Sequence, residues 1–228
     1  MNTTTSTRAE LKARAKETLK DKYWYAFGFA ILVSILIGIA EAISQIPSQL
    51  NPGNTGLLTL TAILGIAVSL FVVFPISVGS NRFFINIAKG NNPDVNDLFY
   101  VYKNGFMNTV LVLLLEGVYI FLWSLLFVIP GIIKAYQYMM IEYMLAENPN
   151  MSNKRAFEIT KATMTGDKWK AFVLGLSFIG WILLSIITFG IGFLFLAPYV
   201  ETTMAHYYLE LKNKAVANGI VDAGELAD

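Results

Sequence analysis

Cysteine is missing from this sequence of 228 residues, and histidine occurs only once. Without cysteine there can be no disulfide, no thiolate metal site and no cysteine nucleophile. A single histidine also excludes a His-Glu-x-x-His zinc pair, and the sequence contains neither a glycine-rich phosphate loop followed by Lys-Ser or Lys-Thr nor a Gly-x-Ser-x-Gly elbow. We therefore expect a protein that is not an enzyme and that binds no cofactor and no metal.

Charged residues are also scarce. They make up 14% of the chain, against about 25% in a typical soluble domain, while 55% of the residues are hydrophobic and the mean hydropathy is +0.55. Asp, Glu, Lys and Arg are absent from residues 23–40, 42–81, 117–133 and 171–200. Such runs indicate membrane spans, because crossing about 30 Å of hydrocarbon takes about 20 helical residues. The alternating pattern of barrel strands is absent, so the sequence predicts an all-α, polytopic membrane helix bundle.

Turn residues divide the chain into a basic amphipathic N-terminal helix (residues 1–22), a membrane domain (23–211) and a cytoplasmic tail (212–228). Charge-free turn residues at 47–54, Pro130-Gly131 and Phe189-Gly190 interrupt the apolar segments, and Pro75 predicts a kink. We predict six spans arranged as three hairpins, each preceded by an amphipathic helix on the cytoplasmic surface. The spans are expected at about residues 23–46, 57–80, 106–129, 132–146, 171–188 and 191–208.

The three amphipathic segments have their own sequence signals. Thr7 and Glu10 form a capping-box pattern, and apolar residues then recur at every fourth position. The apolar positions are Leu11, Ala15 and Leu19 in the first segment, Val95, Leu98, Phe99 and Tyr102 in the second, and Phe157 and Met164 in the third, where Ser152 is the expected cap. The first helix is expected either to lie on the membrane surface or to be a solvated lead-in to the first span.

The distribution of basic residues predicts the orientation. Short loops rich in Lys and Arg stay in the cytoplasm. A six-span chain with both termini inside places sixteen of its seventeen Lys and Arg residues on the cytoplasmic side, with Lys134 as the exception. This spread along one face is explained by topology and by anionic lipid, so we expect no nucleic-acid partner.

A weak internal repeat accompanies the hairpins. The segment Asp21–Phe27 resembles Asp167–Phe172, and Gly131 and Glu142 stand 59 positions before Gly190 and Glu201. Each third of the chain is thus predicted to be one surface helix followed by one hairpin. Transporters contain repeats of this kind, but triplication is also a way to enlarge a bundle.

Several polar residues fall inside the predicted spans. These are Glu116, Lys134, Tyr138, Glu142 and Glu201. Because a charge at the bilayer centre costs about 2.5–3.5 kcal/mol, each needs a reason. One hypothesis is a buried polar path, supplemented by Tyr199 and His206, that relays protons or binds a cation. The other is structural, with Lys134 paired to one glutamate and the remaining carboxyl groups protonated or hydrogen-bonded between helices.

Small residues within the spans predict close helix packing. The glycines at positions 28, 38, 65, 175 and 180 would let neighbouring helices approach one another.

A series of short motifs resembles a known family. In order they are Trp123-Ser124, Ile129-Pro130-Gly131, Ala146-Glu147-Asn148-Pro149, Asp167-Lys168-Trp169, Gly180-Trp181, Thr188–Gly192 and Pro198-Tyr199. They resemble the bacterial integral membrane family catalogued as domain of unknown function nine-seven-five, over nearly the whole chain. The resemblance implies a bacterial cytoplasmic-membrane protein and carries over no activity and no site residue.

Three functions remain as hypotheses. The first is an accessory or interaction protein that works in the lipid bilayer through a membrane-protein partner or a homo-oligomer. The alternative is a small transporter or ion-coupled permease that uses the buried glutamates and Lys134. The third is a lipid-binding or lipid-handling protein, suggested by the basic surface helices.

Overall fold

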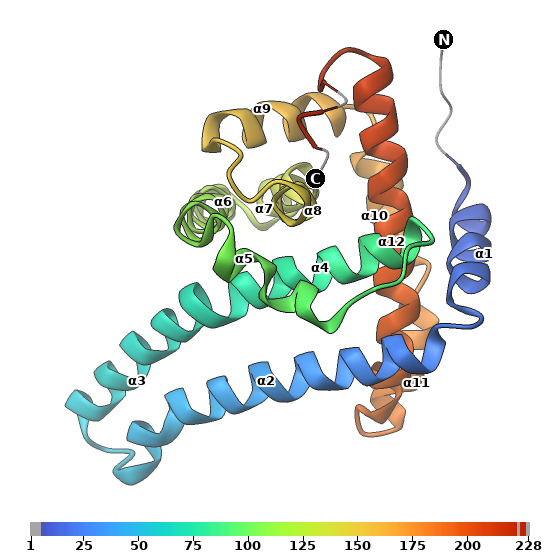
Figure 1. Ribbon diagram of the computed structural model, residues 1–228. Helices are drawn as coiled ribbons and strands as arrows, with labels where there is room; N and C mark the ends of the chain where they lie inside the picture. The colour runs from blue at the N-terminus through green and yellow to red at the C-terminus, as the bar shows by residue number, and fades with distance from the viewer. Residues whose placement is uncertain (1–5, 223, 227–228) are drawn as a thin grey trace.

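The computed structural model describes residues 6–222 and 224–226, and all regular structure within them is helical (Figure 1). In chain order the elements are α1 (Arg8–Leu19), α2 (Tyr23–Leu50), α3 (Thr55–Val68), the π-helical η1 (Ser69–Val73), α4 (Phe74–Ala88), the 3₁₀ helix η2 (Val95–Phe99), α5 (Tyr100–Lys103), α6 (Phe106–Leu126), α7 (Val128–Tyr138), α8 (Ile141–Glu147), α9 (Asn153–Thr163), α10 (Lys168–Leu176), α11 (Ile179–Ile187) and α12 (Ile191–Ala217).

Four helical segments among the described residues are long and apolar enough to cross a membrane. They are Tyr23–Leu50, Thr55–Ala88, Phe106–Leu126 and Lys168–Ile187. The all-helical class is therefore confirmed, with four helices that could span a membrane. The predicted spans at residues 132–146 and 191–208 are not in this group, because α7 and α8 are separate short helices and the second half of α12 is polar.

The first hairpin differs from its predicted boundaries. We expected a loop from residue 47, but α2 continues through Pro47 to Leu50. The turn is limited to residues 51–54, where the side chain of Asn54 accepts a hydrogen bond from the N–H of Leu57 at 3.1 Å and so caps α3.

The irregularity expected at Pro75 is a π turn. Residues Ser69–Val73 form η1 directly before Pro75 in an otherwise continuous helix from Thr55 to Ala88. A proline ring clashes with the preceding helical turn and has no N–H, and a wider turn relieves both problems. The helix then continues beyond residue 80, where the second span was predicted to end, because Phe83, Phe84 and Ile87 are buried.

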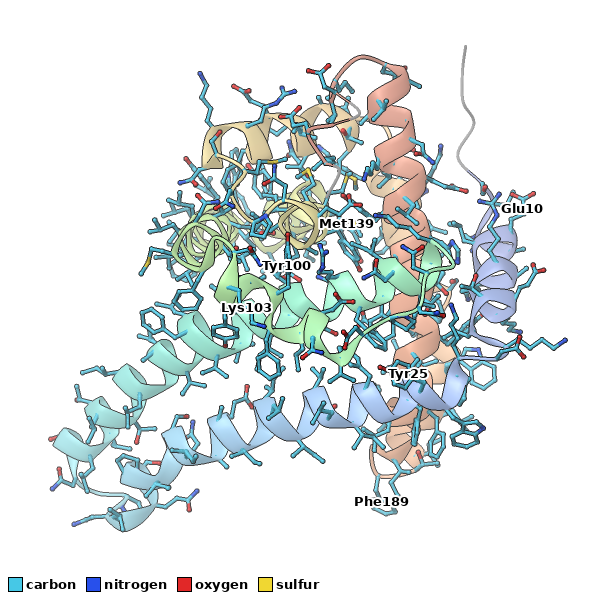
Figure 2. The ribbon with its side chains drawn as sticks, viewed as in Figure 1. Glu10, Tyr25, Tyr100, Lys103, Met139 and Phe189 are labelled. Atoms are coloured by element: carbon cyan, nitrogen blue, oxygen red, sulfur yellow. The ribbon has the colours of Figure 1, made fainter. Side chains whose placement is uncertain are left out.

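The second and third hairpins each contain a further break. In the second hairpin the chain is extended at Phe127, three residues before the predicted break, and it turns again between α7 and α8. In the third hairpin the helix is interrupted between α10, which ends at Leu176, and α11, which begins at Ile179. The turn predicted at Phe189-Gly190 is confirmed, with φ of 52° and 88°. Phe189 is 98% exposed and points away from the tip of this hairpin (Figure 2).

Each surface segment packs on protein. The capping box of α1 is confirmed, and Leu11, Ala15 and Leu19 are buried, with α1 packed against α12. The apolar stripe of α1 is therefore covered by protein and is not free to enter a membrane. In the same way η2 packs on α4, and α9 packs on α6, α7, α8 and α12.

The second surface segment has a different buried face from the one predicted. Leu98 and Val101 are fully buried, whereas Phe99 and Tyr102 are 43% and 38% exposed. The cause is the 3₁₀ geometry of η2, which changes the residue spacing before α5 begins. In the third segment Ser152 caps α9 as expected, and Phe157 and Met164 are buried.

The centre of the molecule is built from α4, α8 and α12. Helix α4 packs on both α8 and α12, and most of the fully buried side chains belong to these helices and the surface segments over them. The far end of the α2–α3 hairpin projects away from this centre (Figure 1). No residue of α3 is buried.

The C-terminal segment also packs on this centre. Val221 and Leu226 are buried, Asn148 donates a hydrogen bond to the carbonyl of Glu225 at 3.0 Å, and Arg155 pairs with the Glu225 carboxylate at 2.6 Å. The described part of the tail is thus held against α8 and α9.

Candidate functional site

The three central helices bring polar side chains together. Asn81 on α4 donates a hydrogen bond from Nδ2 to Oε2 of Glu142 on α8 at 3.0 Å. The carboxyl group of Glu142 is close enough to Glu201 on α12, and to Glu116 on α6, for their charges to interact. We call these three glutamates with Asn81 the carboxylate cluster. Glu142 is therefore within electrostatic range of two other residues singled out from the sequence, although all three are far apart in the chain.

Tyr138 lies at the side of this cluster. Its side chain is 3% exposed, its ring packs edge-on against Phe157 at 5.1 Å, and it interacts electrostatically with Glu116. Tyr138 is thus a neighbour of the cluster on the side of α7.

Lys134 has other partners. Its Nζ atom lies 3.1 Å from Oε1 of Gln137 and 4.7 Å from the centroid of the Trp123 ring, while the Tyr138 ring is 5.8 Å away. Its electrostatic neighbours are the basic residues Lys168 and Lys161. Among the described residues Lys134 forms no ion pair with a carboxylate, so the pairing with a glutamate in the structural hypothesis is not formed.

The two supplementary residues also lie elsewhere. The Tyr199 ring packs edge-on against Phe178, and His206 Nε2 lies 3.0 Å from the hydroxyl of Thr18 on α1. Both therefore join α12 to neighbouring segments and do not extend the carboxylate cluster.

The chemistry open to the cluster is limited. One oxygen of Glu116 is buried and has no hydrogen-bond partner among the described residues. Among the residues that the structure describes, no group of three acidic or histidine side chains is placed so that it could hold a metal ion. Carboxyl groups in this setting bind protons and hydrogen-bond donors, as ionisable groups inside membrane bundles do.

A second polar layer, which sequence reasoning missed, joins the same three helices. The Glu147 carboxylate on α8 is 2.8 Å from Nζ of Lys89 at the end of α4 and 2.7 Å from Nζ of Lys212 on α12. It also accepts a hydrogen bond from the hydroxyl of Tyr208. The side chain is only 2% exposed. Glu147 begins a polar stretch, so its position predicts a solvated loop; only the three-dimensional arrangement shows that it is buried.

Asp167 is a second buried acid of this kind. Its side chain is 1% exposed and lies 3.0 Å from Nζ of Lys170, and it also pairs with Lys214 on α12. Its backbone carbonyl accepts a hydrogen bond from the Tyr207 hydroxyl at 3.1 Å. The Asp-Lys-Trp motif therefore anchors the start of α10 to α12.

The small residues have a different role from the one predicted. A side chain added at Gly28, Gly38, Gly65 or Gly180 would meet nothing within 4 Å, and at Gly175 it would meet only the Tyr136 hydroxyl at 3.6 Å. The expectation that these glycines pack helices together within the chain is wrong. The close approaches lie at other glycines: Gly79 packs against the backbone of Leu98, Gly131 against Ser124, and Gly192 against Ser185.

Comparison with known proteins places the chain in one family. No curated protein and no solved structure matches it. A family model described as "Protein of unknown function (DUF975)" matches residues 1–134 and 125–215, which together include nearly the whole chain, from α1 to residue 215 of α12. The chain therefore belongs to the DUF975 family.

Proposed function

We propose that this chain is a non-catalytic protein of the bacterial cytoplasmic membrane that crosses the bilayer six times, keeps both termini in the cytoplasm and acts by associating with another membrane protein. The broken pair α7–α8 and the first half of α12 supply the two crossings beyond the four long apolar segments. The placement of sixteen of seventeen basic residues on one side supports this topology.

Similar turns support the hairpin arrangement. In the second hairpin Gly131 packs against Ser124, and in the third Gly192 packs against Ser185, and the partners are seven positions apart each time. Each serine hydroxyl donates to the carbonyl four residues earlier at 2.8 Å. The same device thus closes two hairpins, which favours a repeated unit.

The observation that carries the proposed association is the uncovered α2–α3 hairpin. No residue of α3 is buried, and Gly28, Gly38 and Gly65 have open space beside them. In membranes, helices associate largely through small residues that let backbones approach closely. Because these glycines pack nothing within the chain, they are available to helices of a partner protein.

Cross-linking from engineered cysteines tests this proposal, and because the chain has no cysteine of its own, the probe attaches to the chain only at the chosen position. Ile66→Cys places the probe on α3 at a side chain that is 61% exposed, and Ile187→Cys is a matched control on α11 at 73%. With a photoactivatable maleimide in native membranes, we expect position 66 to cross-link to a different membrane protein and position 187 to lipid alone. Lipid alone at both positions would overturn the association, and a product containing only two copies of this chain would replace the partner with a homo-oligomer.

Transport is the second candidate, and the carboxylate cluster is the observation that favours it. Glu142 interacts electrostatically with both Glu116 and Glu201, and Glu116 has a buried oxygen without a hydrogen-bond partner among the described residues. Ionisable residues inside membrane bundles commonly mark proton or ion pathways. Four grooves on the described part of the chain are lined by none of these glutamates. Substitution of Glu142 by Gln in reconstituted vesicles provides the test: a transporter would lose ion-coupled flux, and unchanged flux would eliminate this role for the cluster.

A further inference from the structure

A groove lies where the third hairpin meets the start of the first span. Its main part has a volume of about 410 Å³ and lies against α11, α12 and the first turn of α2. A smaller part of about 260 Å³ adjoins it beside α1. Lys16, Tyr23 and Tyr199 line both parts, so the two form one continuous groove.

One end of this groove is basic. Lys16 on α1 and Lys20, which follows the last residue of α1, are four residues apart and both are exposed. Nζ of Lys16 lies over the Tyr199 ring at 5.7 Å from its centroid. Among the described residues neither lysine forms an ion pair. Like charges at this spacing repel one another, so an anion placed between them would be stabilised.

The other end is apolar, and its hydroxyl groups already form hydrogen bonds within the chain. Trp181, Leu184 and Phe195 line it and are 46–55% exposed, so the chain itself leaves them uncovered. The two hydroxyl groups in this part, those of Ser185 and Thr188, already donate to backbone carbonyls of their own helix at 2.8 and 2.9 Å. Nothing there requires a polar ligand, and an alkyl chain fits this surface.

A second groove repeats this arrangement at another junction. It has a volume of about 450 Å³ and lies between α7 and α10, with Lys168 and Trp169 at one end and Ile129, Ile132 and Ile133 along its wall. Like the first groove, it lies where an Asp-Lys-aromatic motif opens a span: Asp21-Lys22-Tyr23 at one and Asp167-Lys168-Trp169 at the other.

The corresponding junction at the start of α6, beside η1, is filled by side chains of the protein itself. There Phe71 of η1 stacks on Phe106 at 6.1 Å between centroids, and the Tyr102 hydroxyl donates to the Phe71 carbonyl at 3.0 Å. Aromatic side chains take up the space at this junction, which shows that the repeat does not require an open groove.

We propose that the groove between α1–α2 and α11–α12 binds an anionic glycerophospholipid. Its phosphate lies at Lys16 and Lys20, and one acyl chain runs along Trp181, Leu184 and Phe195. Basic pockets between membrane helices on the cytoplasmic side bind anionic headgroups in this manner, and the aromatic rings of Tyr23 and Tyr199 suit the boundary between headgroup and hydrocarbon. A peptide or a soluble anion would leave one end of the groove unmatched. The proposal does not depend on a partner at the α2–α3 hairpin.

Native mass spectrometry of the full chain, reconstituted in vesicles of phosphatidylglycerol and phosphatidylcholine in equal amounts and then extracted in mild detergent, tests this site. The wild-type chain should retain phosphatidylglycerol preferentially. The double variant Lys16→Gln/Lys20→Gln should lose that preference by about fivefold for each lysine removed. The matched control is Lys154→Gln, since the Lys154 side chain is 88% exposed on α9 and lines neither groove.

Two further measurements address the source of the anion and the apolar end. Excess inorganic phosphate should not displace the retained lipid, because the acyl chain contributes to binding. Leu184→Trp, which fills the apolar end, should reduce retention while the circular dichroism stays unchanged. Equal retention of both lipids by the wild-type chain, or the same loss in Lys154→Gln as in the double variant, would overturn the proposal, and displacement by phosphate would reduce the site to a phosphate site without lipid specificity.

Discussion

The Nζ atom of Lys212 on α12 lies 2.7 Å from Oε1 of Glu147 on α8, and Nζ of Lys89 at the end of α4 lies 2.8 Å from the same oxygen. A single buried carboxylate therefore forms ion pairs with two ammonium groups, one following α4 and one on α12. It holds together the three helices that also carry the carboxylate cluster.

Substitution of Glu147 by Gln should destabilise the fold strongly. Removing one member of a buried ionic group leaves the other charges uncompensated, at a cost of about 3–5 kcal/mol. We expect a clear fall in the apparent unfolding temperature, measured by the fluorescence of detergent-solubilised protein. The control is Glu158→Gln, because Glu158 is 52% exposed and lies 3.9 Å from Lys154, so its loss should cost less than about 1 kcal/mol. Equal effects of the two changes would contradict this role of Glu147.

Gly79 sets the distance between α4 and η2. A methyl group at this position would lie against the backbone of Leu98, which cannot move like the end of a flexible side chain. Gly79→Ala should therefore destabilise the protein by about 1–3 kcal/mol. At Gly117 on α6 nothing lies within 4 Å, and Gly117→Ala should leave stability unchanged or raise it by up to about 1 kcal/mol, since alanine favours helix. Thermal unfolding of the two variants side by side checks whether stability falls in Gly79→Ala and stays the same or rises in Gly117→Ala.

Acid should release the C-terminal segment. Hydrogen bonds from Arg155 hold the pKa of Glu225 below its usual value of 4.5, while the same contact raises the pKa of Arg155. A depressed carboxyl pKa stabilises docking at every pH above the unfolded value, and this contribution is lost as the pH falls through the folded value. Hydrogen exchange of residues 218–222 should therefore be constant from neutral pH down to about pH 5 and should rise, after correction for the intrinsic rate, only below about pH 4.5.

The variant Glu225→Gln provides the check on that mechanism. It removes the charge that Arg155 contacts at 2.6 Å, so at neutral pH it should show the fast exchange that the wild-type chain shows in acid. Its exchange should also lose the step below about pH 4.5. A step of unchanged size in the variant would mean that another acid controls the docking.

Much of the local structure followed from the sequence, and the reason is that its signals are local. The Thr7–Glu10 capping box, the stripe of Leu11 and Leu19, and the turn at Phe189-Gly190 depend on neighbouring residues and are present as predicted. The positions of the helix ends were harder to predict from the sequence. Pro47 stays within α2, and α4 continues to Ala88, because packing in the folded protein decides where these helices end.

The candidate site was predicted in part for the same reason. Charge inside an apolar run identified Glu116, Glu142 and Glu201, and the charge of Glu142 does interact with each of the other two. The same reasoning grouped Lys134 with them, although its neighbours are Gln137 and Trp123, since spacing along one helix does not reveal which neighbouring helix a side chain faces. Glu147 was missed because its two lysine partners are 58 and 65 positions away in the chain.

The last prediction distinguishes six spans from four. If α7–α8 and α12 cross the bilayer, the turns at Asn51 and Phe189 are outside and Lys154 is inside. If only the four long apolar segments cross, with the N-terminus still inside, the chain from residue 127 to 167 lies outside and Phe189 lies inside. Because the chain lacks cysteine, the single variants Asn51→Cys, Lys154→Cys and Phe189→Cys can be labelled in intact cells with a membrane-impermeant maleimide. All three positions are exposed in the fold, so a failure to label reports the membrane and not burial. Six spans predict labelling at positions 51 and 189 and protection at 154 until the cells are permeabilised. Labelling at 154 with protection at 189 would instead establish four spans and leave α12 on the inner side.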